Sequence, residues 1–193
     1  MENPSMRRRV FTAMLVATPL LGATMSESVD AAALDPENTL YIDLKDGRVV
    51  IQLFPELAPK QVARTKELTR QHFYDGTPFH RVIDGFMAQG GDPTGTGTGG
   101  SNLPDLPAEF TRTRKFLRGT LGAARTSDPN TANSQFFIMF APAPSLDGQY
   151  TIFGQVVSGM QFVDQIKRGS GGSGMVSGPD KIIHMQVAAD VKG

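Results

Sequence analysis

Short runs of alternating apolar and polar residues, broken repeatedly by glycine and proline, constrain the fold of this chain more than any other feature. Such alternation over about four to eight residues is typical of strands with one buried face. In TLYIDLKDGRVVIQLF, residues 39–54, two runs flank Lys45, Asp46 and Gly47, and Asp-Gly supplies the positive φ angles of a tight hairpin turn. Further short runs follow at residues 80–83, 116–124, 134–140, 150–157 and 180–190.

Two segments instead have helical periodicity. The stretch that begins at Pro59, a residue favoured in the first turn of a helix, places Val62, Leu68 and His72 roughly on one stripe. We expect a helix of about four turns there, and a second amphipathic helix at residues 159–167. Many short strands, two helices and glycine-rich loops predict a mainly β fold, a closed antiparallel barrel capped by the helices.

The composition excludes several classes of function. The formal net charge is zero and no basic block occurs beyond the extreme N-terminus, so the sequence predicts no positively charged surface for a nucleic acid. The chain has no cysteine, which removes disulfides, thiolate nucleophiles and zinc–thiolate sites. Its histidines are His72, His80 and His184, and none lies in an HExxH arrangement. We therefore expect no metal site and no nucleic-acid partner.

The N-terminal segment has the three regions of a secretory signal peptide. Arginines at 7–9 precede an apolar run at 10–21, and alanines occupy 31–33. The apolar run is shorter than the roughly 20 residues that a membrane anchor needs, so we expect export to the periplasm and no membrane attachment after cleavage. The predicted divisions are a cleavable signal peptide at 1–33, a short linker at 34–37 and one folded domain at 38–193.

Two alternatives for the N-terminal segment stay open. Arg8 and Arg9, followed by Val10 and Phe11, could form a twin-arginine signal, although the third arginine and the modest flanking match favour the general secretory route. The other alternative is an amphipathic helix that is not cleaved.

Two glycine-rich stretches match known motifs without the structural context that those motifs need. Gly95, Gly97 and Gly100 satisfy GxGxxG, but prolines follow at once, so no helix N-terminus is available for a pyrophosphate. We interpret this stretch as a turn-forming loop. Residues 171–175 miss the GxSxG nucleophile elbow at the last position and follow no strand, so a serine hydrolase is not supported.

The stretch FHRVIDGFMAQGGD, residues 79–92, places one arginine among large apolar residues. As a strand it projects Arg81 to one side and His80 to the other, so we interpret His80 as structural. In SQFFIMF, residues 134–140, the side chain of Gln135 shares a face with that of Phe137. If the two faces meet, they form an apolar dish with Phe86, Met87 and Phe137 as its floor and Arg81, Gln89 and Gln135 at its rim.

Such a site holds no nucleophile, general base or metal, so it suits a reaction that breaks no σ bond. Rotation about the peptide bond before proline is one, because its barrier of about 18–20 kcal/mol comes from amide resonance. Twisting the amide localises the lone pair on the proline nitrogen, and a donor aimed at that nitrogen stabilises the twisted state more than the planar one. Arg81 supplies a donor that stays charged, and the apolar floor holds the pyrrolidine ring.

Long segments in the correct order make the chain resemble the cyclophilin-type peptidyl-prolyl cis-trans isomerases over about residues 38–191. The matching segments are FHRVIDGFMAQGGD at 79–92, GTGG at 97–100, SQFFI at 134–138 and LDGQYTIFGQV at 146–156. The resemblance implies an eight-stranded antiparallel barrel with two capping helices, and no cofactor. By the same resemblance Arg81 is the catalytic residue, the proline pocket is formed by Phe86, Met87, Phe137 and Leu146, and Gln89 and Gln135 hold the substrate backbone and orient the arginine. We also expect four further residues to bind the substrate: Gly97, Arg125, Thr126 and Tyr150.

The chain departs from many family members in three places. Arg125 and Thr126 stand where Ala-Asn is common. Arg125 either steers acidic substrates or is a solvated charge, and backbone groups at Thr126 could still pair with a substrate. Tyr150 replaces a frequent histidine, and either closes the pocket or is a surface aromatic within a strand. Ser145 replaces a tryptophan that many members use to bind cyclosporin, which argues against strong inhibition.

We expect a monomeric enzyme that acts on proline-containing unfolded or partly folded polypeptides as exported proteins fold. A binding module for proline-containing segments is the alternative, and Arg81 distinguishes the two because binding needs the apolar floor but not the donor. A barrel that binds a small apolar ligand inside is a third hypothesis. The large residues Phe136 and Phe140 at inward positions argue against it.

Overall fold

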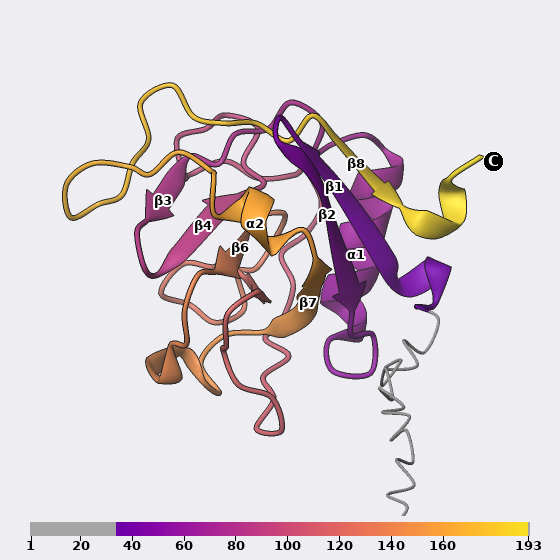
Figure 1. Cartoon of the computed structure of the whole chain (residues 1–193). Helices are drawn as coiled ribbons and strands as arrows, with labels where there is room; N and C mark the ends of the chain where they lie inside the picture. Colours follow the sequence, from indigo (N-terminus) through magenta and orange to yellow (C-terminus); the bar gives the residue numbers. More distant parts are fainter. Residues whose placement is uncertain (1–33, 193) are drawn as a thin grey trace, which may run out of the picture. The chain divides into compact units, whose positions relative to one another are not determined.

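The computed structural model describes residues 34–192, and the predicted signal peptide at residues 1–33 lies outside the described residues. Within residues 34–192 the chain forms one curled antiparallel sheet of eight strands in the order β3-β4-β6-β5-β7-β2-β1-β8 (Figure 1). The strands are β1 (Thr39–Leu44), β2 (Gly47–Leu53), β3 (Arg81–Ile83), β4 (Met87–Gly90), β5 (Thr120–Ala123), β6 (Phe136–Met139), β7 (Ile152–Ser158) and β8 (His184–Val187).

The predicted N-terminal hairpin is confirmed, with one difference in its turn. β1 and β2 pair antiparallel from Thr39 opposite Gln52 to Leu44 opposite Gly47. The two residues between the strands are therefore Lys45 and Asp46, and Gly47 already belongs to β2. Gly47 has a φ of 149°, a conformation that favours glycine.

The two predicted α-helices are present, and both are shorter than expected. α1 (Pro59–Arg70) begins at the predicted proline and packs beside β8 (Figure 1). It ends before His72, so the expectation that His72 continues its apolar stripe is wrong. α2 (Met160–Val163) is a single turn, because the next amides bond three residues back rather than four, as in Ile166 N to the Val163 carbonyl at 3.2 Å. Three short 3₁₀ helices complete the set: η1 (Pro36–Asn38), η2 (Pro144–Leu146) and η3 (Ala188–Asp190).

The prediction of eight antiparallel strands holds, but the prediction of a closed barrel is wrong. β3 and β8 are the two edges of the sheet and do not pair within residues 34–192, so the sheet is an open, curled half-barrel. The reason is that an irregular segment runs along β3. Val82 of β3 donates its N–H to the Gly174 carbonyl at 2.7 Å and accepts from Gly169 at 2.9 Å. These bonds satisfy the outer edge of β3 without a ladder.

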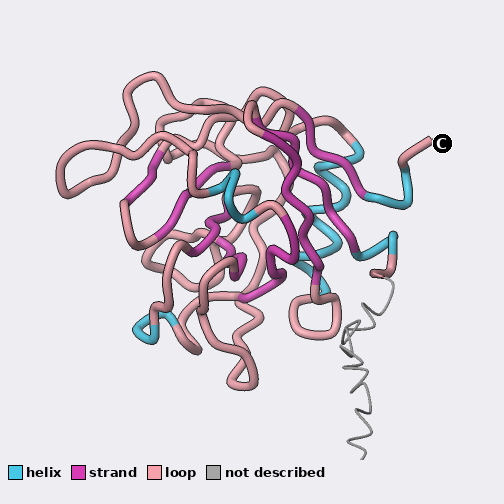
Figure 2. The backbone as a smooth tube through the Cα atoms, in the orientation of Figure 1, coloured by secondary structure: helices cyan, strands magenta, loops and turns pink. Residues whose placement is uncertain are grey.

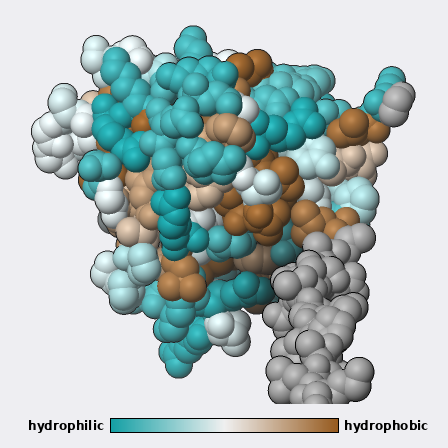
Figure 3. Space-filling view, viewed as in Figure 1, coloured by the Kyte–Doolittle hydropathy of each residue, from teal (hydrophilic) through white to brown (hydrophobic). Residues whose placement is uncertain are grey.

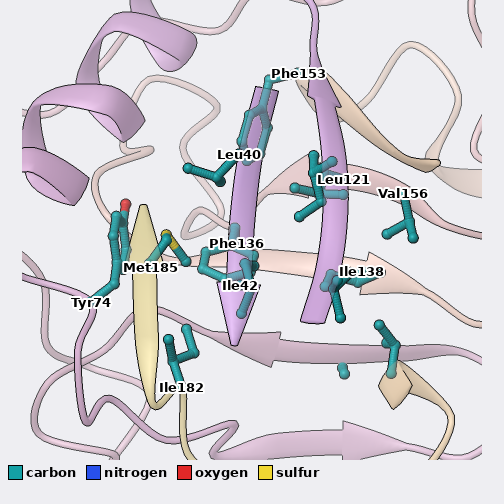
Figure 4. Close-up of a cluster of buried hydrophobic side chains, with 14 of the residues drawn as sticks. Leu40, Ile42, Tyr74, Leu121, Phe136, Ile138, Phe153, Val156, Ile182 and Met185 are labelled. Atoms are coloured by element: carbon teal, nitrogen blue, oxygen red, sulfur yellow. The ribbon is translucent and has the colours of Figure 1, made fainter. Parts of the chain in front are cut away.

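The hollow of the sheet is filled by side chains. Along β1 the buried residues Leu40, Ile42 and Leu44 alternate with more exposed ones, as the sequence pattern predicts. Figure 4 shows Leu40, Ile42, Leu121, Phe136 and Ile138 converging between the strands. Phe136 and Phe140 also belong to this core, which argues against an internal site for a small ligand.

Loops form a large part of the backbone (Figure 2), and the segment between β4 and β5, residues 91–119, contains no strand or helix. On the face shown in Figure 3 hydrophilic residues predominate, with hydrophobic patches between them. Within residues 34–192 we find no helix with the length and apolar character needed to span a membrane.

Candidate active site

Three neighbouring strands bring the central arginine and the apolar residues together. β3 pairs with β4 so that Arg81 lies opposite Gln89, and β4 pairs with β6 so that Gln89 lies opposite Phe137. Residues opposite each other in antiparallel strands project to the same face, so the expectation that the Arg81 and Gln135 strands share a face is confirmed. His80 points the other way and is buried.

A cavity of about 190 Å³ opens over this face. Eight of the residues predicted to form the site line it, and Ala124 is a ninth that sequence reasoning missed. Ala124 directly precedes Arg125, so the signal that could have found it was the strand that leads up to Arg125. The eight predicted residues are Arg81, Phe86, Met87, Gln89, Arg125, Phe137, Leu146 and Tyr150.

A second cavity of about 270 Å³ adjoins the first, because Gln89, Ala124 and Arg125 line both. The other three predicted residues line this second cavity: Gly97, Thr126 and Gln135. The predicted residues therefore divide between two adjoining hollows. Sequence reasoning did not find three further lining residues: Thr98, Thr131 and Asn133.

Hydrogen bonds hold the Arg81 guanidinium in place. Its Nε donates to the Ser173 carbonyl at 3.0 Å and its Nη1 donates to Gln89 Oε1 at 3.2 Å. Gln89 Nε2 in turn donates to Gln135 Oε1 at 2.8 Å. Gln135 Nε2 donates to the carbonyls of Gly97 and Gly99 at 3.0 and 2.8 Å. This chain of bonds fixes the guanidinium at the cavity and ties it to the 97–99 loop.

A carboxylate organises that loop. Asp92 accepts hydrogen bonds from the N–H groups of Thr94 at 2.8 Å, Gly97 at 2.7 Å and Gly99 at 3.1 Å. Burial raises the pKa of the Asp92 carboxyl, but the bonds from Thr94, Gly99 and Gly97 together outweigh burial and hold this pKa below its ordinary value. The ionised carboxylate therefore positions the two carbonyls to which Gln135 binds.

The apolar floor is a small core of its own. Phe137 is only 5% exposed and stacks on Phe116, with ring centroids 5.7 Å apart and an interplanar angle of 25°. Tyr150 meets the Phe137 ring edge-on at 5.8 Å. Met87 is 2% exposed in the same cluster, against which Phe86 packs. Side chains confined in this way give a rigid surface on which an apolar ring can rest.

Arg125 and Tyr150 form one wall. The Arg125 guanidinium lies 4.3 Å from the centroid of the Tyr150 ring, and its Nη2 donates to the Gln149 carbonyl at 2.8 Å. Arg125 is thus held against the wall rather than free in solvent. Tyr150 lies before β7 and lines the pocket. It is therefore not a surface aromatic within a strand.

The backbone of Thr126 already has partners inside the protein. Its N–H donates to Thr131 Oγ1 at 3.0 Å and its carbonyl accepts from Arg125 Nη1 at 2.8 Å. The N–H therefore has a partner inside the protein, whereas the carbonyl oxygen keeps a second lone pair, and pairing of this backbone with a substrate stays a prediction. Ser145 lies in η2, next to the pocket residue Leu146.

Comparison with known proteins agrees with this geometry. The family model "Cyclophilin type peptidyl-prolyl cis-trans isomerase/CLD" matches residues 39–187. A probable peptidyl-prolyl cis-trans isomerase of Brucella suis is 52% identical over 190 residues, which cover 92% of this chain and 96% of the relative. Peptidyl-prolyl cis-trans isomerase B of Bacillus subtilis is 42% identical over 132 residues, which cover 68% of this chain and 92% of that one.

Solved structures give the same result. A cyclophilin from Hirschia baltica superposes with a TM-score of 0.74 at 26% identity, covering 82% of this chain and 77% of the other. A cyclophilin-type isomerase from Cryptosporidium parvum, solved in the presence of the dipeptide Ala-Pro, superposes with a TM-score of 0.72 at 33% identity, covering 77% and 98%.

The fold and the relatives define the class, and the chain belongs to the cyclophilin-type peptidyl-prolyl cis-trans isomerase family. It is a peptidyl-prolyl cis-trans isomerase. The expectation of an enzyme rather than a binding module is confirmed.

Proposed function

We propose that this isomerase accelerates rotation about X-Pro bonds in exported proteins as they fold, with Arg81 as its catalytic residue. The reaction uses no covalent intermediate and no metal ion. The observation that carries the proposal is the position of the guanidinium, held by the Ser173 carbonyl and Gln89 at the edge of an apolar cavity. A donor held there meets the proline nitrogen while the ring rests on Phe137 and Met87.

The physical task is to favour the twisted amide over the planar one. An acceleration of about 10⁵-fold requires about 7 kcal/mol of preferential stabilisation. A charge-assisted hydrogen bond to the pyramidal nitrogen exists only in the twisted state, so it lowers the barrier rather than merely tightening binding. The apolar floor contributes by holding the ring while the rest of the peptide turns, which reduces the entropy that the transition state must lose.

The substrate class follows from the shape of the two cavities. The first has an apolar floor sized for a small ring, and the Cryptosporidium relative was solved in the presence of Ala-Pro. The adjoining hollow offers polar groups for neighbouring residues of the same peptide. A monomer is sufficient, because every residue of the proposed site comes from one chain.

The cellular setting is the periplasm. Support comes from the sequence of residues 1–33, with its arginines, apolar run and alanines. A chain without cysteine also has no thiol that an oxidising compartment would pair wrongly. Exported polypeptides fold outside the cytosol, where slow X-Pro isomerisation limits many of them.

Replacing Arg81 with alanine tests the catalytic role. In a refolding assay limited by proline isomerisation we expect kcat/KM to fall about 100- to 1,000-fold, as when a donor to a transition state is lost elsewhere. Arg112→Ala is the matched control, since Arg112 is exposed and lines neither cavity of the site. An Arg81→Ala enzyme as active as the wild type would refute the assigned role, and circular dichroism would show whether both variants remain folded.

A further inference from the structure

Outside the two cavities of the active site, His184 meets His72 and Asp75, which lie more than 100 positions earlier in the chain. His72 follows α1, Asp75 lies three residues later, and His184 begins β8. His72 Nδ1 lies 3.1 Å from Asp75 Oδ2, and His184 Nδ1 lies 2.9 Å from the same oxygen. One atom from each residue falls within 4.8 Å of the other two. The group shares no residue with either cavity of the active site.

The backbone at His72 is in an unusual conformation. Its φ is 56°, and within residues 34–192 it is the only residue other than glycine with a positive φ. The position closes α1, since His72 N bonds to the Thr69 carbonyl at 3.0 Å and Phe73 N to the Leu68 carbonyl at 3.0 Å. Helices commonly end in this way, with glycine at the left-handed position. A side chain there is strained, and strain of this kind gathers at functional sites.

The left-handed turn directs the His72 ring towards its partners. The rings of His72 and His184 stack with centroids 5.6 Å apart and an interplanar angle of 24°. Both Nδ1 atoms lie within hydrogen-bond distance of the same oxygen, Asp75 Oδ2. The strained residue thus places an imidazole where two other ligand-type groups already converge.

A backbone bond fixes the aspartate as well. Asp75 Oδ1 accepts from Met185 N at 2.8 Å, which leaves Oδ2 for the two histidines. A carboxylate oriented by a backbone N–H has the support that metal-binding carboxylates usually have.

We propose that His72, Asp75 and His184 form a site for a divalent first-row transition cation, and we take Zn²⁺ as the probe. Tetrahedral zinc with bonds of about 2.0–2.1 Å places its ligand atoms about 3.4 Å apart. The two Nδ1–Oδ2 separations, 3.1 and 2.9 Å, lie within about half an ångström of that value. In the hydrogen-bonded form an Nδ1 proton faces the carboxylate, and the cation takes its place while the proton moves to Nε2.

Access and position suggest what the cation does. A cavity of about 270 Å³ lies beside the two histidines, and the His72 side chain is 69% exposed, so water can complete the coordination. The cation joins the end of α1 to β8, an edge strand of the sheet. It therefore stabilises the fold and takes no part in isomerisation.

Titration of the purified protein with Zn²⁺ tests the site, using a purification tag without histidine. We expect one Zn²⁺ per chain by calorimetry and a higher melting temperature in its presence. His72→Gly should weaken binding at least about 100-fold, since loss of a residue that only orients a metal ligand already costs 10- to 100-fold. Glycine suits the left-handed backbone better than histidine, so this variant remains folded and its loss of binding has one explanation. His184→Gln should lose binding to the same extent.

Two further measurements separate this proposal from the isomerase. Arg81→Ala should bind Zn²⁺ as the wild type does, while His72→Gly should keep its isomerase activity with and without Zn²⁺. X-ray absorption of the zinc-loaded protein should show two imidazole ligands. A wild-type protein that takes up no Zn²⁺, or one whose affinity is unchanged in both histidine variants, would overturn the site.

Discussion

Arg81 depends on Gln89 for its orientation, and this dependence can be measured. Gln89 Oε1 accepts from Arg81 Nη1 at 3.2 Å, so Gln89→Leu keeps the size of the side chain and removes the acceptor. The guanidinium then keeps only its bond to the Ser173 carbonyl. We expect kcat/KM to fall about 10-fold, which corresponds to about 1.4 kcal/mol. The double variant with Arg81→Ala should be no slower than Arg81→Ala alone, whereas additive losses would show that Gln89 acts independently of Arg81.

His80 makes stability depend on pH. It is 1% exposed, and neither ring nitrogen has a hydrogen-bond partner among residues 34–192. Burial lowers the pKa of His80 below its ordinary value of 6.5, although the negative charge of Asp92 offsets part of the effect. Below pH 6.5 the unfolded chain therefore binds a proton that the folded chain does not, so the folded state loses stability as pH falls from 6.5 to the lower folded pKa.

The matching variant is His80→Leu, and the measurement is urea unfolding between about pH 7 and pH 4.5. Wild-type stability should fall by at most about 1.4 kcal/mol per pH unit because of this proton, and the variant should lack that part of the slope. Asp92 does not account for this slope, because its pKa lies below the ordinary value of 3.8. Its contribution to the free energy of unfolding is lost only at lower pH. Parallel pH profiles for the two proteins would contradict the assignment.

The residues of the site differ in how far the sequence alone reveals them. Arg81, Gln89 and Phe137 could be predicted, because strand alternation decides which face a side chain occupies. Ser173 could not, because its carbonyl reaches Arg81 across 92 positions of the chain. Nothing in the local pattern around Arg125 shows that its guanidinium rests on Tyr150. Contacts that depend on the meeting of two loops require the tertiary structure.

At the scale of elements, α1 is capped by a carboxylate from a distant loop. The residue before the helix, Ala58, makes no side-chain cap. Glu109 supplies it instead, accepting from Lys60 N and Gln61 N at 3.0 Å each. Glu109→Ala should therefore lower the free energy of unfolding by about 1–2 kcal/mol, through loss of both bonds and of the charge at the helix N-terminus.

Urea unfolding measures this effect as a lower midpoint with an unchanged m-value. The matched control is Glu56→Ala, since Glu56 is exposed and close to the start of α1. It should change the free energy of unfolding by no more than about 0.5 kcal/mol. If both variants lost the same stability, the cap would contribute nothing beyond a general loss of negative charge near the helix.

Most strands and helices could be predicted from the sequence, whereas the open edge of the sheet could not. The β1–β2 hairpin and the start of α1 follow from local signals, namely alternation, Lys-Asp-Gly and Pro59. The open edge depends on residues 169–174, which bond to Val82 in place of a strand. That segment is rich in glycine and has no periodicity, so the sequence could only describe it as a loop.

For the whole molecule, the proposed cation site shows the limit of reading motifs along the chain. No HExxH arrangement links the histidines, and His184 lies 109 positions from Asp75. Only the docking of β8 beside the end of α1 brings these residues together. A ligand set that is assembled by tertiary structure leaves no spacing that the sequence could reveal.

Export is the remaining property of the whole molecule, and fractionation of cells that express the full chain tests it. We expect the protein in the periplasm, shortened to an N-terminus near Leu34, because small residues precede that point and an apolar run of this length is cleaved rather than retained. Replacing Arg8 and Arg9 with lysine preserves the positive charge but removes a twin-arginine signal. The general secretory route predicts unchanged export of that variant, and its accumulation in the cytosol would assign the twin-arginine route instead. Full-length protein in the cytosol, in both forms, would contradict export altogether and leave the isomerase with cytosolic substrates.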